Sequence, residues 1–322
     1  MVVRYVLRAL LFTVGAVCYA LLNVLSQLSK EPDGSYAYSL PTVVQTAEFA
    51  KLCLSFGFLT SELGSFREAW RLVLRTSRKK WLLSAVPSVL YAINNNLDML
   101  NNQYMDPATE SVLGQLKILT TGLAWKLVFG KQLGVRKWLA LALLCIGCIG
   151  AGWPTTAAAN SMYCQPVGLV FIFFYVWISA SAGVYNEWLY KDGSNETIHI
   201  CNIRIYTVGV LFCLLTHIIT QSGNKTNSLA DFYKGYNVYT WGLVATYSVM
   251  GLLLAQVMKF FDSIVKLFIS ASSMYVSAVF TVALFERVPS MLFAGSLGIV
   301  TMALLLYNME RIMPLLAGTK KE

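Results

Sequence analysis

Ten predominantly apolar stretches, each about as long as a membrane-crossing helix, constrain the fold of this chain more than any other feature. A helix needs about 20 residues to cross the hydrocarbon core of a bilayer. We therefore expect an all-α polytopic membrane protein in which ten transmembrane helices form one transporter domain over residues 1–322. The ten expected spans are residues 5–28, 41–63, 81–103, 108–128, 134–153, 166–190, 198–221, 238–260, 264–285 and 289–309.

The composition agrees with this class. Of the 322 residues, 57% are hydrophobic and only 13% are charged, whereas a soluble domain carries about 25% charged residues. This excludes a soluble enzyme and a disordered chain. The apolar stretches are continuous rather than alternating, which also argues against a transmembrane β-barrel.

Most of the net charge of +9 falls in segments that an even number of spans places on one side of the membrane. Since basic loops stay cytosolic, we expect both termini in the cytosol, and no nucleic-acid partner. The loop 222–237 would then face the lumen with its Asn224 glycosylation sequon, while the Asn195 sequon would lie on a cytosolic loop. The basic positions on the expected cytosolic side are Arg4, Arg8, the cluster within 67–80, Lys131, Arg136, Lys137, Lys191, Arg311, Lys320 and Lys321.

The sequence predicts no catalytic or metal-binding site. Cys145 and Cys148 form the only Cys-x-x-Cys pair among seven cysteines, and no second pair or nearby histidine completes a zinc site. The two histidines have no plausible nucleophile beside them. We therefore expect a protein that is not an enzyme and that needs no cofactor. The glycine-rich segment 147–152 is typical of close helix packing.

A faint internal repeat divides the chain into approximate halves, 1–153 and 166–309. Tyr104–Ala108 resembles Phe260–Ile264, and Phe129–Leu133 resembles Leu284–Val288. Five spans per half require opposite orientations, the arrangement of transporters that place their substrate site at the repeat interface. Chance similarity of short apolar segments remains the alternative.

Polar side chains recur within the apolar spans at spacings that place them on one helix face. Such residues usually line a cavity and mark function. Lysines suit a phosphate, and tyrosines and amides suit a base or a sugar. The positions are Glu48, Lys51, Tyr91, Asn95, Asp98, Asn102, Glu110, Lys117, Ser179, Tyr185, Glu187, Asn202, Tyr206 and Lys266.

Several of these side chains also have a purely structural interpretation. Glu48 and Lys51 lie three residues apart and would neutralise one another. The amides of residues 94–96 would join neighbouring helices by hydrogen bonds. Asp106, before a proline, is typical of a helix N-cap, and Glu187 would be a structural acid near the cytosolic end of its helix.

Five segments resemble the nucleotide-sugar transporter family, within the ten-helix drug/metabolite transporter superfamily. The match is closest to the branch of CMP-sialic acid and UDP-galactose transporters. The segments occur in order with family-like spacing: 87–96 resembles "PSLxYAxxNN", 115–118 "QLKI", 183–187 "GVYxE", 202–206 "NIQxY" and 262–266 "DNIxK".

The resemblance implies exchange of a cytosolic nucleotide sugar for a lumenal nucleoside monophosphate across the Golgi membrane, by alternating access. It assigns the nucleotide to Tyr91, Asn95, Ser179, Asn202 and Tyr206. It assigns the phosphate to Lys117 and Lys266, and coupling or gating to Glu48, with Lys51 beside it, and Glu187. Membrane lipid is an expected partner, and a homodimer is left open.

One departure from the family pattern bears on the substrate. The family has "YQV" where this chain has Glu110-Ser111-Val112, and the tyrosine there helps to hold the base. If Glu110 faces the site, its carboxylate accepts a hydrogen bond from the amino group of cytosine but not from O4 of uracil. This favours CMP and a CMP-linked, sialic acid-like sugar. The alternatives are a UDP-sugar/UMP antiporter of the UDP-galactose type and a membrane scaffold without transport activity.

Overall fold

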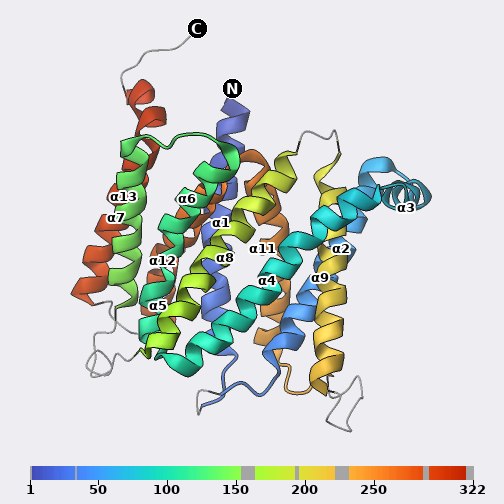
Figure 1. Ribbon diagram of the computed structural model, residues 1–322, viewed down its shortest axis with the longest axis horizontal. Coiled ribbons are helices and arrows are strands. Elements are labelled where there is room, and N and C mark those ends of the chain that lie inside the picture. Colours follow the sequence, from blue (N-terminus) through green and yellow to red (C-terminus); the bar gives the residue numbers. More distant parts are fainter. Residues whose placement is uncertain are drawn as a thin grey trace. The chain divides into compact units, whose positions relative to one another are not determined.

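The computed structural model describes residues 2–32, 35–153, 164–192, 196–221, 232–285 and 290–316, and these segments are built from helices (Figure 1). Outside the helices they contain one isolated β-bridge, between Met105 and Cys164. The helices are α1 Val2–Leu28, α2 Leu40–Leu63, α3 Phe66–Leu74, α4 Arg78–Tyr104, α5 Pro107–Gly114, α6 Lys117–Phe129, α7 Val135–Gly152, α8 Pro166–Lys191, α9 Ile198–Gln221, α11 Val238–Phe260, α12 Ser263–Phe285 and α13 Met291–Leu316.

Helical segments cover the ten ranges expected from the sequence, and they make the chain a multi-pass membrane protein. By length and apolarity, eight helical spans in the described residues qualify as membrane-crossing. The helices α2 and α4 are long but do not meet this criterion, since each carries charged or amide side chains along its length. The count of ten spans therefore stays a prediction.

The expected span over 108–128 corresponds to the candidate membrane span Thr109–Phe129, but it is not one regular helix. The segment forms α5 and α6, with a tightened turn between them. The amide of Gln115 donates to the carbonyl of Val112 at 3.2 Å, and that of Ile118 donates to Gln115 at 2.9 Å. These bonds reach three residues back instead of four, which is 3₁₀ geometry and a common mark of a hinge. Lys117 begins the helix directly after this turn.

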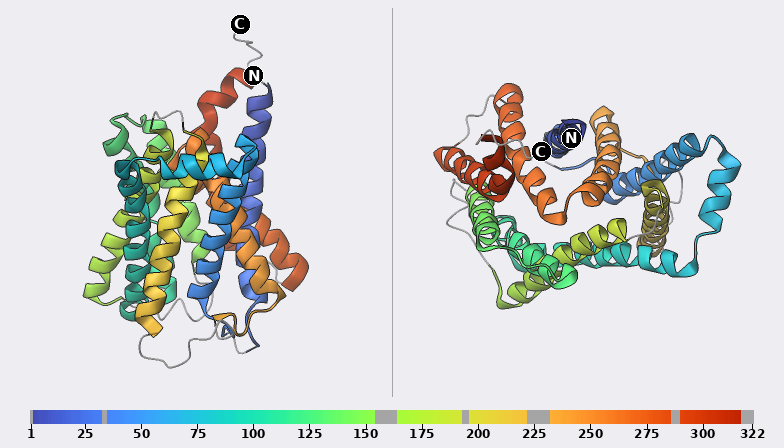
Figure 2. Two further views of the ribbon diagram at one scale, coloured as in Figure 1. Left: turned by 90° about the vertical axis from the view of Figure 1, so that its right-hand side faces the viewer. Right: turned by 90° about the horizontal axis from the view of Figure 1, so that it is seen from above.

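The short helix α3 was not expected, because its basic residues were interpreted as part of a loop. It follows a turn at Gly64, whose φ of 67° is in the left-handed region. Ser65 caps its first turn by accepting a hydrogen bond from the amide of Glu68 at 3.4 Å. In the left view of Figure 2, α3 runs crosswise to the long helices beside it.

The chain divides into two compact units that are each discontinuous in sequence. Unit 1 comprises residues 1–92 and 186–262, and unit 2 comprises residues 93–185 and 263–322. The boundaries fall inside α4 and α8, so each of these helices contributes one part to each unit. Each unit thus draws on both approximate halves of the sequence.

In unit 1, α2 packs against α9 and α11, and α1 packs against α11. One buried cluster contains Val43 and Ala47 of α2 with Leu243 and Val244 of α11. A second cluster joins α2 and α3 to α9 and contains Leu59, Ala69, Val73, Ile200 and Ile203. These apolar contacts join α2 to both α9 and α11.

In unit 2, α7 and α13 pack directly against one another (Figure 1). A Cβ added at Gly147 would lie 2.7 Å from Cγ2 of Val300, and one at Gly150 would lie 2.5 Å from Oγ of Ser296. Only glycine allows this approach. The interpretation of segment 147–152 as a close-packing face is confirmed.

Candidate functional site

The polar side chains that the sequence singles out gather most clearly in unit 1, beginning with a charged pair on α2. Lys51 forms an ion pair with Glu48, one helical turn away, and their side chains are 12% and 21% exposed. The expectation that these two residues neutralise one another is confirmed. A charge pair taken this far out of water costs solvation energy that the pairing only partly recovers.

The surroundings of the pair come from α9 and α11. The Nζ atom of Lys51 lies 4.9 Å from the centroid of the Tyr206 ring, within cation–π range. A Cβ at Gly251 would lie 2.3 Å from Cδ of Lys51, and one at Gly209 would lie 3.1 Å from Oε2 of Glu48. Two glycines thus make room for the two charged side chains. Sequence reasoning missed both, because their importance depends on what faces them.

Two hydrogen bonds involve residues expected to bind the nucleotide. Tyr190 donates from its hydroxyl to Oδ1 of Asn202 at 2.8 Å, and Asn186 donates from Nδ2 to the hydroxyl of Tyr91 at 3.0 Å. Asn202 and Tyr206 are buried. Tyr91 and Asn202 therefore form hydrogen bonds with side chains of α8. Tyr190 and Asn186 were not selected from the sequence.

Glu187 is fully buried and forms an ion pair with Lys191, one turn later on α8, at 2.7 Å. The pair lies at the carboxyl end of the helix, where a cation also interacts favourably with the helix dipole. This geometry fits the structural interpretation of Glu187, and its role in gating stays a prediction.

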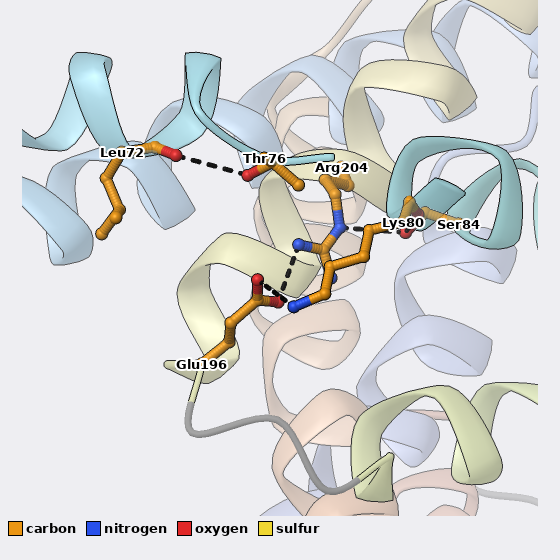
Figure 3. A network of polar contacts seen from close by, with 6 residues as sticks. All are labelled: Leu72, Thr76, Lys80, Ser84, Glu196 and Arg204. Carbon is orange, nitrogen blue, oxygen red and sulfur yellow. Dashed lines mark hydrogen bonds and ion pairs between the residues drawn. The ribbon is translucent and has the colours of Figure 1, made fainter. Parts of the chain in front are cut away.

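A second polar network lies where α4 and α9 begin (Figure 3). Glu196 accepts from Nζ of Lys80 at 2.6 Å and from Nη1 of Arg204 at 2.9 Å, and Nε of Arg204 donates to Oγ of Ser84 at 3.1 Å. Partial burial alone would raise the pKa of Glu196. The hydrogen bonds and charges of Lys80 and Arg204 outweigh burial, so the pKa lies below its ordinary value of 4.5.

A cavity of about 280 Å³ adjoins this network. None of the side chains expected to bind nucleotide lines it. Its walls come from the end of α8, the start of α9 and Lys259: Leu189, Tyr190, Lys191, Asp192, Glu196, Thr197, Ile198, Cys201, Arg204 and Lys259.

The remaining site predictions fall on unit 2 and are spread over several helices. Glu110 lies on α5, Lys117 begins α6, Ser179 lies on α8 and Lys266 lies on the first turn of α12. All four side chains are partly buried. The side chains of Asn95, Asp98 and Asn102 lie outside the described set, as do residues Asn195 and Asn224 of the two sequons.

Two smaller expectations can be compared with the described residues. Asp106 accepts from the amide of Thr109 at 3.0 Å, which confirms it as the N-cap of α5. The described histidines, cysteines, aspartates and glutamates form no group of three or more that could hold a metal ion.

Comparison with known proteins identifies the class to which these helices and polar clusters belong. The model of the nucleotide-sugar transporter family matches residues 3–308. The chain is therefore a member of the nucleotide-sugar transporter family.

Individual relatives are similar to the chain over most of its length. CMP-sialic acid transporter 1 of Oryza sativa subsp. japonica is 32% identical over 307 residues, which cover 91% of this chain and 90% of the relative. The UDP-N-acetylglucosamine transporter of Mus musculus is 32% identical over 296 residues, covering 88% and 89%. A solved crystal structure with 12% identity superposes with a TM-score of 0.67, covering 93% of this chain and 96% of the other, which supports the fold alone.

Proposed function

We propose that this protein is a Golgi antiporter that exchanges a cytosolic CMP-linked sugar, similar to CMP-sialic acid, for lumenal CMP. Membership of the nucleotide-sugar transporter family supports the substrate class. The observation that carries the proposal furthest is the Glu48–Lys51 pair against Tyr206. A membrane protein without a polar ligand or a coupled transition has little reason to keep such a pair inside.

The proposed mechanism is alternating access without covalent chemistry. Ten spans in two inverted five-helix repeats, with both termini cytosolic, would expose one site to the cytosol and the lumen in turn. Nucleotide binding would lower the barrier to reorientation, which makes exchange obligatory. The hydrogen bonds of Tyr91 and Asn202 to α8 would then be exchanged for bonds to the nucleotide during the cycle.

The phosphate is assigned to Lys117 and Lys266, which supply positive charge beside apolar neighbours. In proteoliposomes loaded with CMP, Lys117→Ala and Lys266→Ala are each expected to abolish uptake of the CMP-linked sugar. Lys137→Ala, in the first turn of α7, is the control and should exchange normally. Normal exchange by both site variants, with the proteins folded, would reject the assignment.

The preference for cytosine rests on Glu110, one of whose carboxylate oxygens is buried. Stabilisation of the purified protein by CMP, but not by UMP, GMP or AMP, is expected in a thermal-shift series. In Glu110→Gln the amide can also donate a hydrogen bond, so O4 of uracil becomes acceptable and UMP should stabilise the variant. Stabilisation of the native protein by UMP but not CMP would reverse the substrate assignment.

A UDP-sugar/UMP antiporter is the second candidate, because the UDP-N-acetylglucosamine transporter of mouse is also 32% identical to this chain over 296 residues. A membrane scaffold without transport activity is a third. It predicts that no nucleotide stabilises the protein and that no sugar exchange occurs. The thermal-shift series and the exchange assay together separate the three.

A further inference from the structure

The helix α3 carries two apolar stripes, of which the protein covers only one. Ala69 and Val73 are buried against Leu59 of α2 and Ile200 and Ile203 of α9. The second stripe consists of Phe66, Trp70 and Leu74, which are 64%, 51% and 66% exposed. These three residues are spaced four apart, so they lie on one face of the helix.

A basic stripe adjoins the exposed apolar one. Arg67, Arg71 and Arg75 each follow a residue of the apolar stripe by one position, which turns them about 100° around the helix. Arg78 and Lys79 continue the charge at the start of α4, and all five side chains are exposed. Glu68 is the single carboxylate on α3. The helix therefore presents an apolar edge beside a face of like positive charge.

The position of α3 fixes what can meet these stripes. Ile200 and Ile203, against which α3 packs, belong to the first turns of the candidate membrane span Ile198–Leu215. Thus α3 lies at the level where this span leaves the hydrocarbon. It runs crosswise to α2 and α9 (Figure 2), as a helix in the plane of the membrane surface does.

The helix is also held in place rather than free to turn. The ring of Phe56 contacts the rings of Phe66 and Trp70, with centroids 5.2 Å and 6.0 Å away. Just beyond α3, Thr76 donates from its hydroxyl to the carbonyl of Leu72 at 3.3 Å, and the Lys80–Glu196 ion pair anchors the start of α4 (Figure 3). The exposed stripe is therefore a fixed surface.

We propose that α3 is an interfacial helix that recruits acidic phospholipids around the protein. Phe66, Trp70 and Leu74 would lie among the upper acyl chains, and the arginines would bind the negatively charged headgroups. Tryptophan and arginine on adjacent faces suit this boundary. Each basic side chain near an anionic surface raises the association constant for that surface by about fivefold.

The test uses the full chain in vesicles of phosphatidylcholine and phosphatidylserine at 70:30, with bromine on the acyl chains of one lipid at a time. Bromine quenches tryptophan, and the difference between native protein and Trp70→Phe isolates Trp70. Per mole of brominated lipid, quenching of Trp70 by phosphatidylserine should exceed that by phosphatidylcholine several-fold. Arg67→Gln/Arg71→Gln should remove the preference, whereas the matched double variant Lys131→Gln/Arg136→Gln should retain it.

A measurement on the native protein guards against misfolding of the variants. Raising the salt concentration from 0.05 to 0.5 M shortens the range of electrostatic attraction, and it should reduce the preference towards parity. Equal quenching by the two lipids at low salt would overturn the proposal. So would the absence of any quenching of Trp70, or quenching that falls as protein becomes more concentrated in the bilayer, since a second copy would then cover α3.

Discussion

In unit 1, α2 meets α9 and α11 across an ion pair, a tyrosine ring and two glycines that accommodate the charged side chains. In unit 2, α7 meets α13 across glycines that accommodate the small side chains of Val300 and Ser296. Glycine serves both contacts, but for opposite purposes. Between α7 and α13 it lets the two helices pack closely, whereas around Lys51 it makes space for a group that costs energy to bury.

The difference separates helix contacts built for stability from those kept for another reason. Small-residue packing needs no justification beyond the dispersion energy that it supplies. A buried charge pair contributes little net stability and is often replaceable by apolar residues. Substitutions in the two contacts should therefore affect unfolding and transport in different proportions.

Lys51→Met is expected to have the largest effect. It leaves the carboxylate of Glu48 without its cation in a half-buried position, so the variant should lose about 2–4 kcal/mol of stability and all sugar exchange. Thermal unfolding in detergent and exchange in proteoliposomes measure the two effects. Glu48→Gln/Lys51→Met removes both charges and should recover most of the stability but no exchange. If the double variant exchanges normally, the pair is only structural.

Gly147→Ala should have the next largest effect, on stability alone. The new Cβ would lie 2.7 Å from Cγ2 of Val300 and 3.2 Å from the backbone nitrogen of the same residue. Since a backbone cannot yield as a side chain does, α7 and α13 must separate, at a cost of about 1–3 kcal/mol. Thermal unfolding should show this loss while the KM for exchange stays unchanged. Gly183→Ala, with no atom within 4 Å of its Cβ, is the matched control.

Gly251→Ala should have the opposite outcome, with slower exchange and little loss of stability. Its Cβ would lie 2.3 Å from Cδ of Lys51, but a lysine side chain can move aside, so the stability loss should stay within about 1 kcal/mol. Displacing the ammonium group from Glu48 and Tyr206 should nevertheless slow exchange several-fold. Gly57→Ala, on α2 with open space around its Cβ, should exchange at the native rate. Equal rates for the two variants would contradict a role for the position of Lys51.

The contrast also shows which parts of the structure could be predicted from the sequence. Contacts between residues close in the chain could be predicted. Asp106 as an N-cap and the pairing of Glu48 with Lys51 both follow from spacing alone. Helix α3 could also have been predicted, because the apolar residues Phe66, Trp70 and Leu74 recur every four residues. Contacts between residues far apart in the sequence could not be predicted. Gly251 matters only because α11 faces Lys51, and Tyr190 only because α8 ends beside α9.

The turn between α5 and α6 is a second feature that could not be predicted from the sequence. The sequence 108–128 has the length and apolarity of one span, and no proline or glycine pair interrupts it near Lys117. The carbonyl of Gln115 accepts from the amide of Ile118 within the turn, and it also accepts from the thiol of Cys145 on α7 at 3.6 Å. A hydrogen-bond donor on another helix thus helps to stabilise the turn, and the sequence of this span alone cannot reveal that donor.

Glu196→Gln should have the smallest effect, and it tests a polar contact outside the charge pair of α2. The pKa of Glu196 lies below 4.5 in the folded protein. Between that lowered value and 4.5 the unfolded chain binds more protons than the folded one, so the stabilisation is fully present above 4.5 and is lost as the pH falls through the lowered value. At pH 7.5 the variant should unfold with a deficit of about 0.5–1 kcal/mol, and this deficit should shrink on acidification below pH 4.5.

Thermal unfolding of the native protein and Glu196→Gln at pH 7.5 and pH 4 measures that change. Glu68→Gln removes one exposed negative charge from α3 and controls for net charge. Exchange at pH 7.5 should be unaltered in both variants, because neither side chain belongs to the Lys51 cluster. A deficit of the same size at both pH values would mean that Glu196 contributes through its shape rather than through its charge between Lys80 and Arg204.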